Sequence, residues 1–327
     1  MFPEVRLRRL RAHPRLRRML GTPIPGPEKM IWPAFVVPGE GVREPIDSMP
    51  GQERLSIDQL IADVAQLVER GIGGILLFGI AQSHEKDACG TAAFDEEGVV
   101  QQAVRALKQA YPDFLVIADV CVCAYTDHGH CGPLADEGDV ANDLALESLS
   151  KTALSMAVAG ADIVAPSAMM DGQVHAIRTA LDEAGFTQTL ILSYSTKFAS
   201  ALYGPFRDAE KSSPQEGDRQ GYQANYADAK TARRESVFDE VEGADMLMIK
   251  PALFYLDILS QMRATTDLPI AAYHVSGEYA MIHATAEKGW GELKALARES
   301  TVAMVRAGAD ILITYWANQY DEIFRDD

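Results

Sequence analysis

Three of the four cysteines lie within eleven residues, at Cys121, Cys123 and Cys131. They follow an apolar run at residues 114–118, which predicts a buried strand. The first two thiols lie where this strand is expected to end. Side chains two apart in extended backbone project to the same side, and Gly129 allows the chain to turn back and return the third thiol. Three thiolates in tetrahedral reach suit a zinc ion, and the position they leave open is typical of a catalytic zinc.

Other interpretations of this cluster stay open. Free cysteine is among the most buried residue types, so the thiols could be unrelated core residues. His128 and His130 are also candidate ligands, and a fourth protein ligand would indicate a structural zinc in a non-enzymic scaffold. Cys89 lies outside the cluster and is expected to be structural.

Two lysines suggest a second kind of chemistry. Lys197 and Lys250 follow successive apolar runs. A lysine that is desolvated, or close to another ammonium, has a lowered pKa, and its neutral amine attacks ketones to form a Schiff base. The alternative is that each side chain reaches solvent past the end of its strand. A class I aldolase also uses a barrel lysine, but it would explain neither the thiol cluster nor the second lysine.

The elements that must position these residues recur along the chain. Helix-periodic segments such as residues 56–70, with Ser56 as N-cap and Gly71 as stop, separate the apolar runs. Gly-Ala-Asp precedes three runs, as expected of a repeated helix-to-strand turn. Near-continuous apolar runs suit strands covered on both faces. We therefore predict a (β/α)8 TIM barrel, with a doubly wound open sheet as the alternative. The eight runs are 30–37, 73–80, 114–121, 162–168, 189–195, 244–250, 268–275 and 309–316.

In such a barrel the carboxyl ends of the strands meet at one mouth. The ends of these runs are polar, and they hold Asp119, Ser167, Lys197, Lys250, Ser276 and Tyr315. The long polar interval 204–235 is expected to supply an active-site lid, at about residues 204–224.

An extended N-terminal arm, residues 1–28, precedes the predicted barrel at residues 29–327, because three prolines at 23, 25 and 27 prevent a continuous helix. Residues 1–20 hold seven arginines against one acidic residue, Glu4, while the whole chain has a formal charge of −17. A basic arm with interleaved leucines favours docking on an acidic neighbouring subunit, and hence a homo-oligomer. A transit peptide and a nucleic-acid tail are the competing interpretations.

Composition narrows the class of protein further. The acidic balance argues against nucleic acid as a partner of the body. No apolar run reaches 18 residues, so we expect no membrane span. Few cysteines, most of them clustered, favour metal binding in a reducing, cytoplasmic location over disulfides.

Several long segments together resemble the porphobilinogen synthase (5-aminolevulinate dehydratase) family, in its zinc-dependent bacterial form. They are DVCVCAYTDHGHCG, APSAMMDGQ, LSYSTKFASALYGPFR, GDRQGYQ, ADMLMIKPALFYLD, YHVSGEYAM and AGADILITYW. The resemblance implies a (β/α)8 barrel with an N-terminal arm, usually assembled as an octamer. It also implies a lyase that condenses two 5-aminolevulinate molecules to porphobilinogen, with loss of two waters, in tetrapyrrole (haem) biosynthesis.

The resemblance implies roles for individual residues. Lys250 would be the principal Schiff-base lysine and Lys197 the second, with Zn2+ on the three cysteines. Asp119 would accept a proton, or would merely fix a loop.

The remaining implied contacts concern the substrates. Two side chains would bind one substrate carboxylate, Ser276 and Tyr315, and three would bind the other, Arg207, Arg219 and Gln223. Tyr203 and Phe206 would line the pocket, and Ser167 and Asp171 would add polar contacts. Glu235, in the string RRES, would bind Mg2+ outside the active site, the alternative being an ordinary surface residue.

Overall fold

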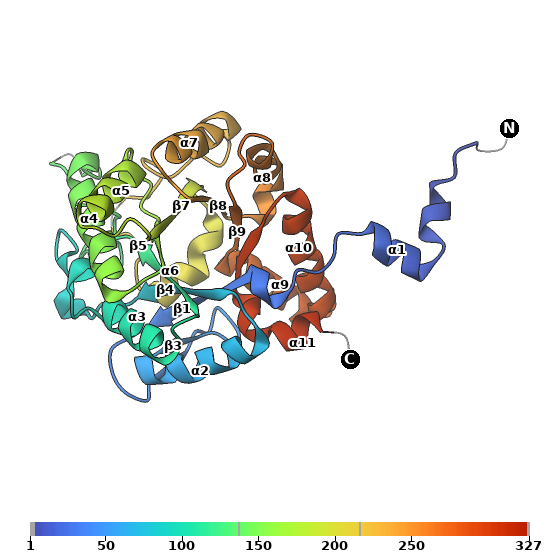
Figure 1. Ribbon diagram of the computed structural model, residues 1–327, viewed down its shortest axis with the longest axis horizontal. Coiled ribbons are helices and arrows are strands. Elements are labelled where there is room, and N and C mark those ends of the chain that lie inside the picture. Colours follow the sequence, from blue (N-terminus) through green and yellow to red (C-terminus); the bar gives the residue numbers. More distant parts are fainter. Residues whose placement is uncertain (1–3, 137, 216, 326–327) are drawn as a thin grey trace.

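The computed structural model describes residues 4–136, 138–215 and 217–325. Within them, eight parallel strands form a closed barrel, because the last strand pairs back with the first (Figure 1). The predicted barrel is confirmed, and the open sheet is excluded. All eight strands coincide with the predicted runs, and one extends two residues further, to Lys197. They are β1 (Met30–Val36), β4 (Gly74–Gly79), β5 (Leu115–Val120), β6 (Ile163–Pro166), β7 (Leu190–Lys197), β8 (Met246–Lys250), β9 (Ile270–His274) and β10 (Ile311–Thr314).

Helices surround the barrel as a ring in Figure 1. They are α2 (Ile57–Arg70), α3 (Val99–Ala110), α4 (Asn142–Ala159), α5 (Gln173–Glu183), α7 (Ala229–Val241), α8 (Leu256–Arg263), α9 (Ser276–Glu287), α10 (Leu293–Ala307) and α11 (Tyr320–Phe324). Ser56 and Gly71 do bound α2, but the Ser56 side chain does not cap it. Its Oγ instead accepts a hydrogen bond from the Val42 N–H and donates one to Asp58. Among the described helices, none has both the length and the apolar character needed to cross a bilayer.

The three Gly-Ala-Asp turns share one geometry. Gly160, Gly243 and Gly308 have φ of 103°, 105° and 125°, which favours glycine where a helix must stop. The aspartate of each turn accepts a hydrogen bond from a backbone N–H near the start of the preceding barrel strand. The pairs are Asp162 with Val116, Asp245 with Ile191 and Asp310 with Ile270. Each turn thereby ties two neighbouring strands together at their amino ends.

A short hairpin that the sequence did not predict lies beside the carboxyl end of β1. Strand β3 (Glu53–Leu55) pairs with the last residues of β1, and β2 (Arg43–Pro45) runs antiparallel to β3. Arg54 donates hydrogen bonds of 2.7 and 2.9 Å to the carbonyls of Ala209 and Asp208. These carbonyls belong to helix α6 (Gly204–Glu210), which lies across the middle of the barrel in Figure 1. The hairpin thus anchors the first part of the predicted lid over the mouth.

The N-terminal segment projects away from the barrel in Figure 1. It contains the short η1 (Leu7–Arg11) and α1 (Pro14–Leu20), and none of their residues is buried. Leu7 and Met19 keep 66% and 80% of their surface exposed. Exposed apolar side chains gathered on one segment mark a candidate interaction surface.

Candidate active site

The two predicted lysines end neighbouring strands and are direct register partners, Lys197 on β7 and Lys250 on β8. Both are buried, at 5% and 3% exposure. The Lys250 Nζ lies 4.2 Å from the ring centroid of Tyr273 and 4.6 Å from that of Phe206. Desolvation, together with the charge of Lys197, lowers the pKa of Lys250 to about 7. A large fraction of this amine is therefore neutral, and nucleophilic, near neutral pH.

Asp119 is connected to Lys197 through one intermediate residue. The Lys197 Nζ donates a hydrogen bond to the Ser167 carbonyl, and the Ser167 Oγ donates to Asp119 Oδ2 at 3.1 Å. Among the described residues the other carboxylate oxygen, Oδ1, is buried without a partner. Burial raises the pKa of Asp119 to about 7, although both lysines oppose the shift. The group can therefore hold or release a proton near neutral pH.

The three clustered cysteines are brought together as the spacing predicted. Their sulfur atoms all lie within 4.8 Å of one another, and all three side chains are buried. The return of Cys131 depends on Gly129, which has φ of 76° and where a Cβ would lie 2.6 Å from the Ser213 carbonyl oxygen. Hydrogen bonds from Cys121 and Cys123, with the charge of Arg219, lower the pKa of Cys131. Three soft thiol ligands converging in this way can hold a metal ion.

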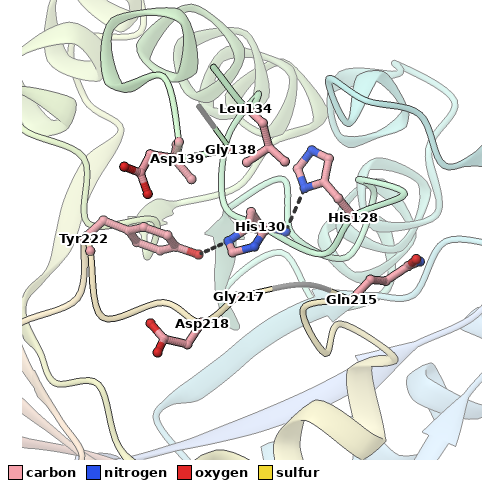
Figure 2. Close-up of a pocket in the computed structure, with 11 residues that line it drawn as sticks. His128, His130, Leu134, Gly138, Asp139, Gln215, Gly217, Asp218 and Tyr222 are labelled. Carbon is pink, nitrogen blue, oxygen red and sulfur yellow. Dashed lines mark hydrogen bonds between the residues drawn. The ribbon is translucent and has the colours of Figure 1, made fainter. Parts of the chain in front are cut away.

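The two candidate histidine ligands do not join this sulfur cluster in the described part of the chain. They line a cavity of about 530 Å³ together with Tyr222 and Asp218, and Figure 2 shows these side chains. The backbone N–H of His130 donates to His128 Nδ1, and His130 Nδ1 lies 3.2 Å from the Tyr222 hydroxyl (Figure 2). His128 Nε2 lies 3.2 Å from the Ala88 carbonyl oxygen. These ring nitrogens are thus engaged outside the metal cluster.

Two of the predicted carboxylate-binding residues are buried in the predicted lid. Arg219 is 6% exposed and donates hydrogen bonds to the carbonyls of Gly129 and Ser212. Gln223 is 4% exposed, and both its side-chain polar atoms are buried without partners among the described residues. A buried amide without partners is costly. Gln223 therefore marks a place where a polar ligand would be stabilised.

Arg207 carries a second guanidinium near Arg219. It is half-buried, and its Nε has no partner among the described residues. Desolvation and the charge of Arg219 lower the pKa of Arg207. Two neighbouring cations that repel each other favour an anion between them.

The remaining predicted pocket residues surround the lysines. Ser276 Oγ accepts a hydrogen bond from the Phe206 N–H at 3.0 Å, so it joins α9 to the lid helix. The Tyr315 hydroxyl lies 3.3 Å from that of Tyr273. The Tyr203 hydroxyl donates to the Lys250 carbonyl at 3.0 Å, and its ring faces the Lys250 amine.

One buried ionisable residue at the site was not predicted from the sequence. Glu210, at the end of α6, is 4% exposed, and its Oε2 lies 3.8 Å from Cys123 Sγ. Burial raises its pKa to about 8. The string DAEKSS is typical of a solvated helix end, so no pattern in the sequence could have singled it out.

Glu235 lies on α7, away from the lysines and thiols. It lines a cavity of about 350 Å³ together with Asp171, Asp239 and Glu242. Burial and the charge of Asp171 raise its pKa. The predicted contact of Asp171 with substrate and the predicted magnesium site at Glu235 thus concern the same acidic cavity.

Comparison with known proteins now adds to this geometry. A family model described as delta-aminolevulinic acid dehydratase matches residues 4–323. The chain belongs to this family. A delta-aminolevulinic acid dehydratase of Halalkalibacterium halodurans is 52% identical over 95% of this chain and 94% of its own length. One of Synechococcus elongatus is 50% identical, over 97% and 98%.

A solved structure extends the family likeness to three dimensions. The delta-aminolevulinic acid dehydratase (porphobilinogen synthase) of Toxoplasma gondii, in complex with its reaction product porphobilinogen, superimposes with a TM-score of 0.95. It is 42% identical in sequence, and the match covers 98% of this chain and 91% of that one. Membership of the dehydratase family therefore rests on sequence and fold together.

Proposed function

We propose that this chain is a porphobilinogen synthase, a hydro-lyase that condenses two 5-aminolevulinate molecules to porphobilinogen with loss of two waters. The observation that carries the proposal is the placing of two buried amines, Lys197 and Lys250, in register at one barrel mouth. The names of the relatives and the product bound to the Toxoplasma gondii protein support it.

The lysines suit the covalent part of this reaction. The neutral amine of Lys250 attacks the keto carbon of one substrate, and loss of water gives an iminium. This iminium makes the carbon electrophilic and acidifies the neighbouring C–H bonds, as carbon–carbon coupling requires. Lys197 would hold the second substrate in the same way. Asp119, which is joined to Lys197 through Ser167, would accept a proton near neutral pH, because burial raises its pKa to about 7.

The thiols of Cys121, Cys123 and Cys131 suit Zn2+, which when bound would supply a Lewis acid beside the substrates. Arg219 then serves two purposes, because its charge offsets the thiolates and its lid position brings it toward substrate. Arg207, Arg219 and Gln223 would bind one substrate carboxylate, and Ser276 and Tyr315 the other. Tyr203, Phe206 and Ser167 would shape the pocket around the lysines.

A colorimetric measurement of porphobilinogen formed from 5-aminolevulinate tests the reaction directly. We expect product with zinc, and loss of product after chelation while circular dichroism shows the barrel still folded. Absence of product in the zinc-loaded protein would refute the assignment. Retained activity in metal-free protein would refute the metal part alone.

A second metal, Mg2+, is proposed at Glu235. Its carboxylate lies in an acidic cavity, and magnesium can keep most of its waters while using one carboxylate. The Glu235→Ala variant should lose any magnesium stimulation of turnover but keep its zinc dependence. Stimulation that persists in this variant would place the magnesium elsewhere.

The N-terminal arm is proposed to join copies of the chain into a homo-oligomer, with an octamer as the expected size. Two features of the arm support this proposal. Its apolar residues, such as Leu7 and Met19, are exposed, and its arginines carry the opposite charge to the acidic remainder of the chain.

A further inference from the structure

Glu210 is a buried carboxylate that the proposed reaction does not use. It is 4% exposed, and among the described residues none of the ion pairs includes it. Its Oε2 accepts a hydrogen bond from the Ser212 hydroxyl and lies 3.8 Å from Cys123 Sγ. Buried acidic residues are normally paired with a cation or bound to a metal. In the described part of the chain, Arg219 and Lys250 act on Glu210 electrostatically without forming an ion pair with it, and a bound metal ion would compensate the carboxylate directly.

We propose that the Glu210 carboxylate is a fourth protein ligand of the metal ion held by the three cysteines, and that it fills the open position until substrate enters. The inference rests on the proposed metal site. It differs from that proposal because it assigns a ligand from the lid rather than from the strand end.

One distance, between Glu210 and Cys123, fits a shared ion. A sulfur about 2.3 Å and an oxygen about 2.0 Å from one tetrahedral zinc lie about 3.5 Å apart. The observed separation of 3.8 Å between Glu210 Oε2 and Cys123 Sγ is close to this value. The three sulfurs alone form the described group within 4.8 Å, so the Glu210 side chain must turn further toward the other two cysteines on binding.

The lid helix supplies the means of holding Glu210 there. Arg54 fixes the carbonyls of Asp208 and Ala209, which directly precede Glu210 in α6. The backbone that precedes Glu210 is therefore anchored. Rotation of the Glu210 side chain would bring its carboxylate to the metal ion. The charge of Arg219, which lies near the thiols, offsets part of the added negative charge.

Such a ligand would be readily replaced. Zinc binds thiolates more strongly than it binds a hard carboxylate oxygen. With zinc bound, an amine or carboxylate of the entering substrate would therefore replace Glu210, and the cysteines would hold the ion. This exchange would couple substrate entry to the side-chain conformation of Glu210.

Cobalt(II) titration of the full chain, without substrate, tests the ligand directly. Cobalt reports thiolate ligation through a charge-transfer band and its coordination sphere through visible d–d bands. We expect Glu210→Ala to keep the charge-transfer band, to change the d–d bands, and to bind cobalt at least about tenfold more weakly. Glu210→Gln, which preserves side-chain volume, should show the same changes if the alanine variant folds poorly.

Asp208→Asn is the matched control, because it removes an exposed carboxylate from the same helix. It should leave both the spectrum and the affinity unchanged. Spectra and affinities for Glu210→Ala and Glu210→Gln that equal those of the unmodified chain would overturn the inference, leaving the cysteine site intact. Absence of a charge-transfer band in the unmodified chain would instead refute the metal site, and the Glu210 ligand with it.

Discussion

Lys197 and Lys250 face each other as register partners at the carboxyl ends of adjacent strands. Parallel pairing holds both side chains at the same height in the barrel mouth, so their amines enter one dry volume rather than two. The charge of Lys197 then makes protonation of Lys250 less favourable, and this repulsion adds to desolvation in lowering the pKa of Lys250.

This pairing predicts the pH dependence of Schiff-base trapping. Because the pKa of Lys250 is lowered from 10.5 to about 7, its reactive neutral fraction should rise as the pH passes through 7. At pH 7 that fraction is about a thousandfold larger than for an ordinary lysine. Borohydride reduction with 5-aminolevulinate, read by peptide mass spectrometry, measures the adduct at Lys250. Trapping that rises only above pH 9 would contradict the prediction, and Lys250→Met supplies the blank.

The thiol cluster predicts a selective loss of metal. Cys131→Ala removes one of three converging sulfurs and should weaken zinc binding by more than about tenfold. Competition with a chromophoric chelator measures the affinity. Cys89→Ala is the matched control, since Cys89 is exposed and outside the cluster. Equal affinities for the two variants would argue against a metal site on these cysteines.

Substitution of Gln223 should weaken substrate binding without lowering the stability of the fold. Its amide has no partners among the described residues, so Gln223→Leu should not lower the free energy of unfolding. A hydrogen bond to a charged substrate group is worth about 1.5–3 kcal/mol, so KM should rise about tenfold or more. Steady-state kinetics and denaturant unfolding measure the two effects. An unchanged KM with reduced stability would make Gln223 a structural residue instead.

Substitution of Asp245 should lower the stability of the fold without changing turnover. Asp245→Ala leaves the Ile191 N–H without its side-chain acceptor, which should cost about 1–3 kcal/mol in the free energy of unfolding. Turnover measured well below the unfolding transition should be unchanged, because the contact is far along β7 from Lys197. A loss of kcat without a loss of stability would show that the strand end also positions the lysine.

The arm predicts a change in particle mass. Deleting residues 1–28 removes the exposed apolar side chains and the arginines that are proposed to dock on a neighbour. Light scattering should then report a smaller assembly, with circular dichroism confirming an intact barrel. A truncated chain of unchanged subunit number would exclude the arm from assembly.

The strands could be predicted from the sequence because a parallel barrel buries both faces of each strand and so leaves uninterrupted apolar runs. Strands β2 and β3 could not, because each is only three residues long and Leu55 is the one buried apolar residue in the two. The Ser56 side chain was misjudged for a related reason. A serine before a helix predicts a cap, but the tertiary contact with Val42 took its hydroxyl.

Site residues could be predicted from the sequence where they end a strand or stand in a motif that matches a known family. The thiols and both lysines come together as spacing and strand ends indicated. Glu210 was not predictable, since its burial results from the fold of the lid over the mouth rather than from its neighbours in sequence. Long-range contacts of this kind have no local signature.

The aspartates of the Gly-Ala-Asp turns join neighbouring strands by hydrogen bonds at the rim opposite the lysines and thiols. Substitutions at that rim can therefore change the heat stability of the barrel while the reacting groups at the other rim keep their places.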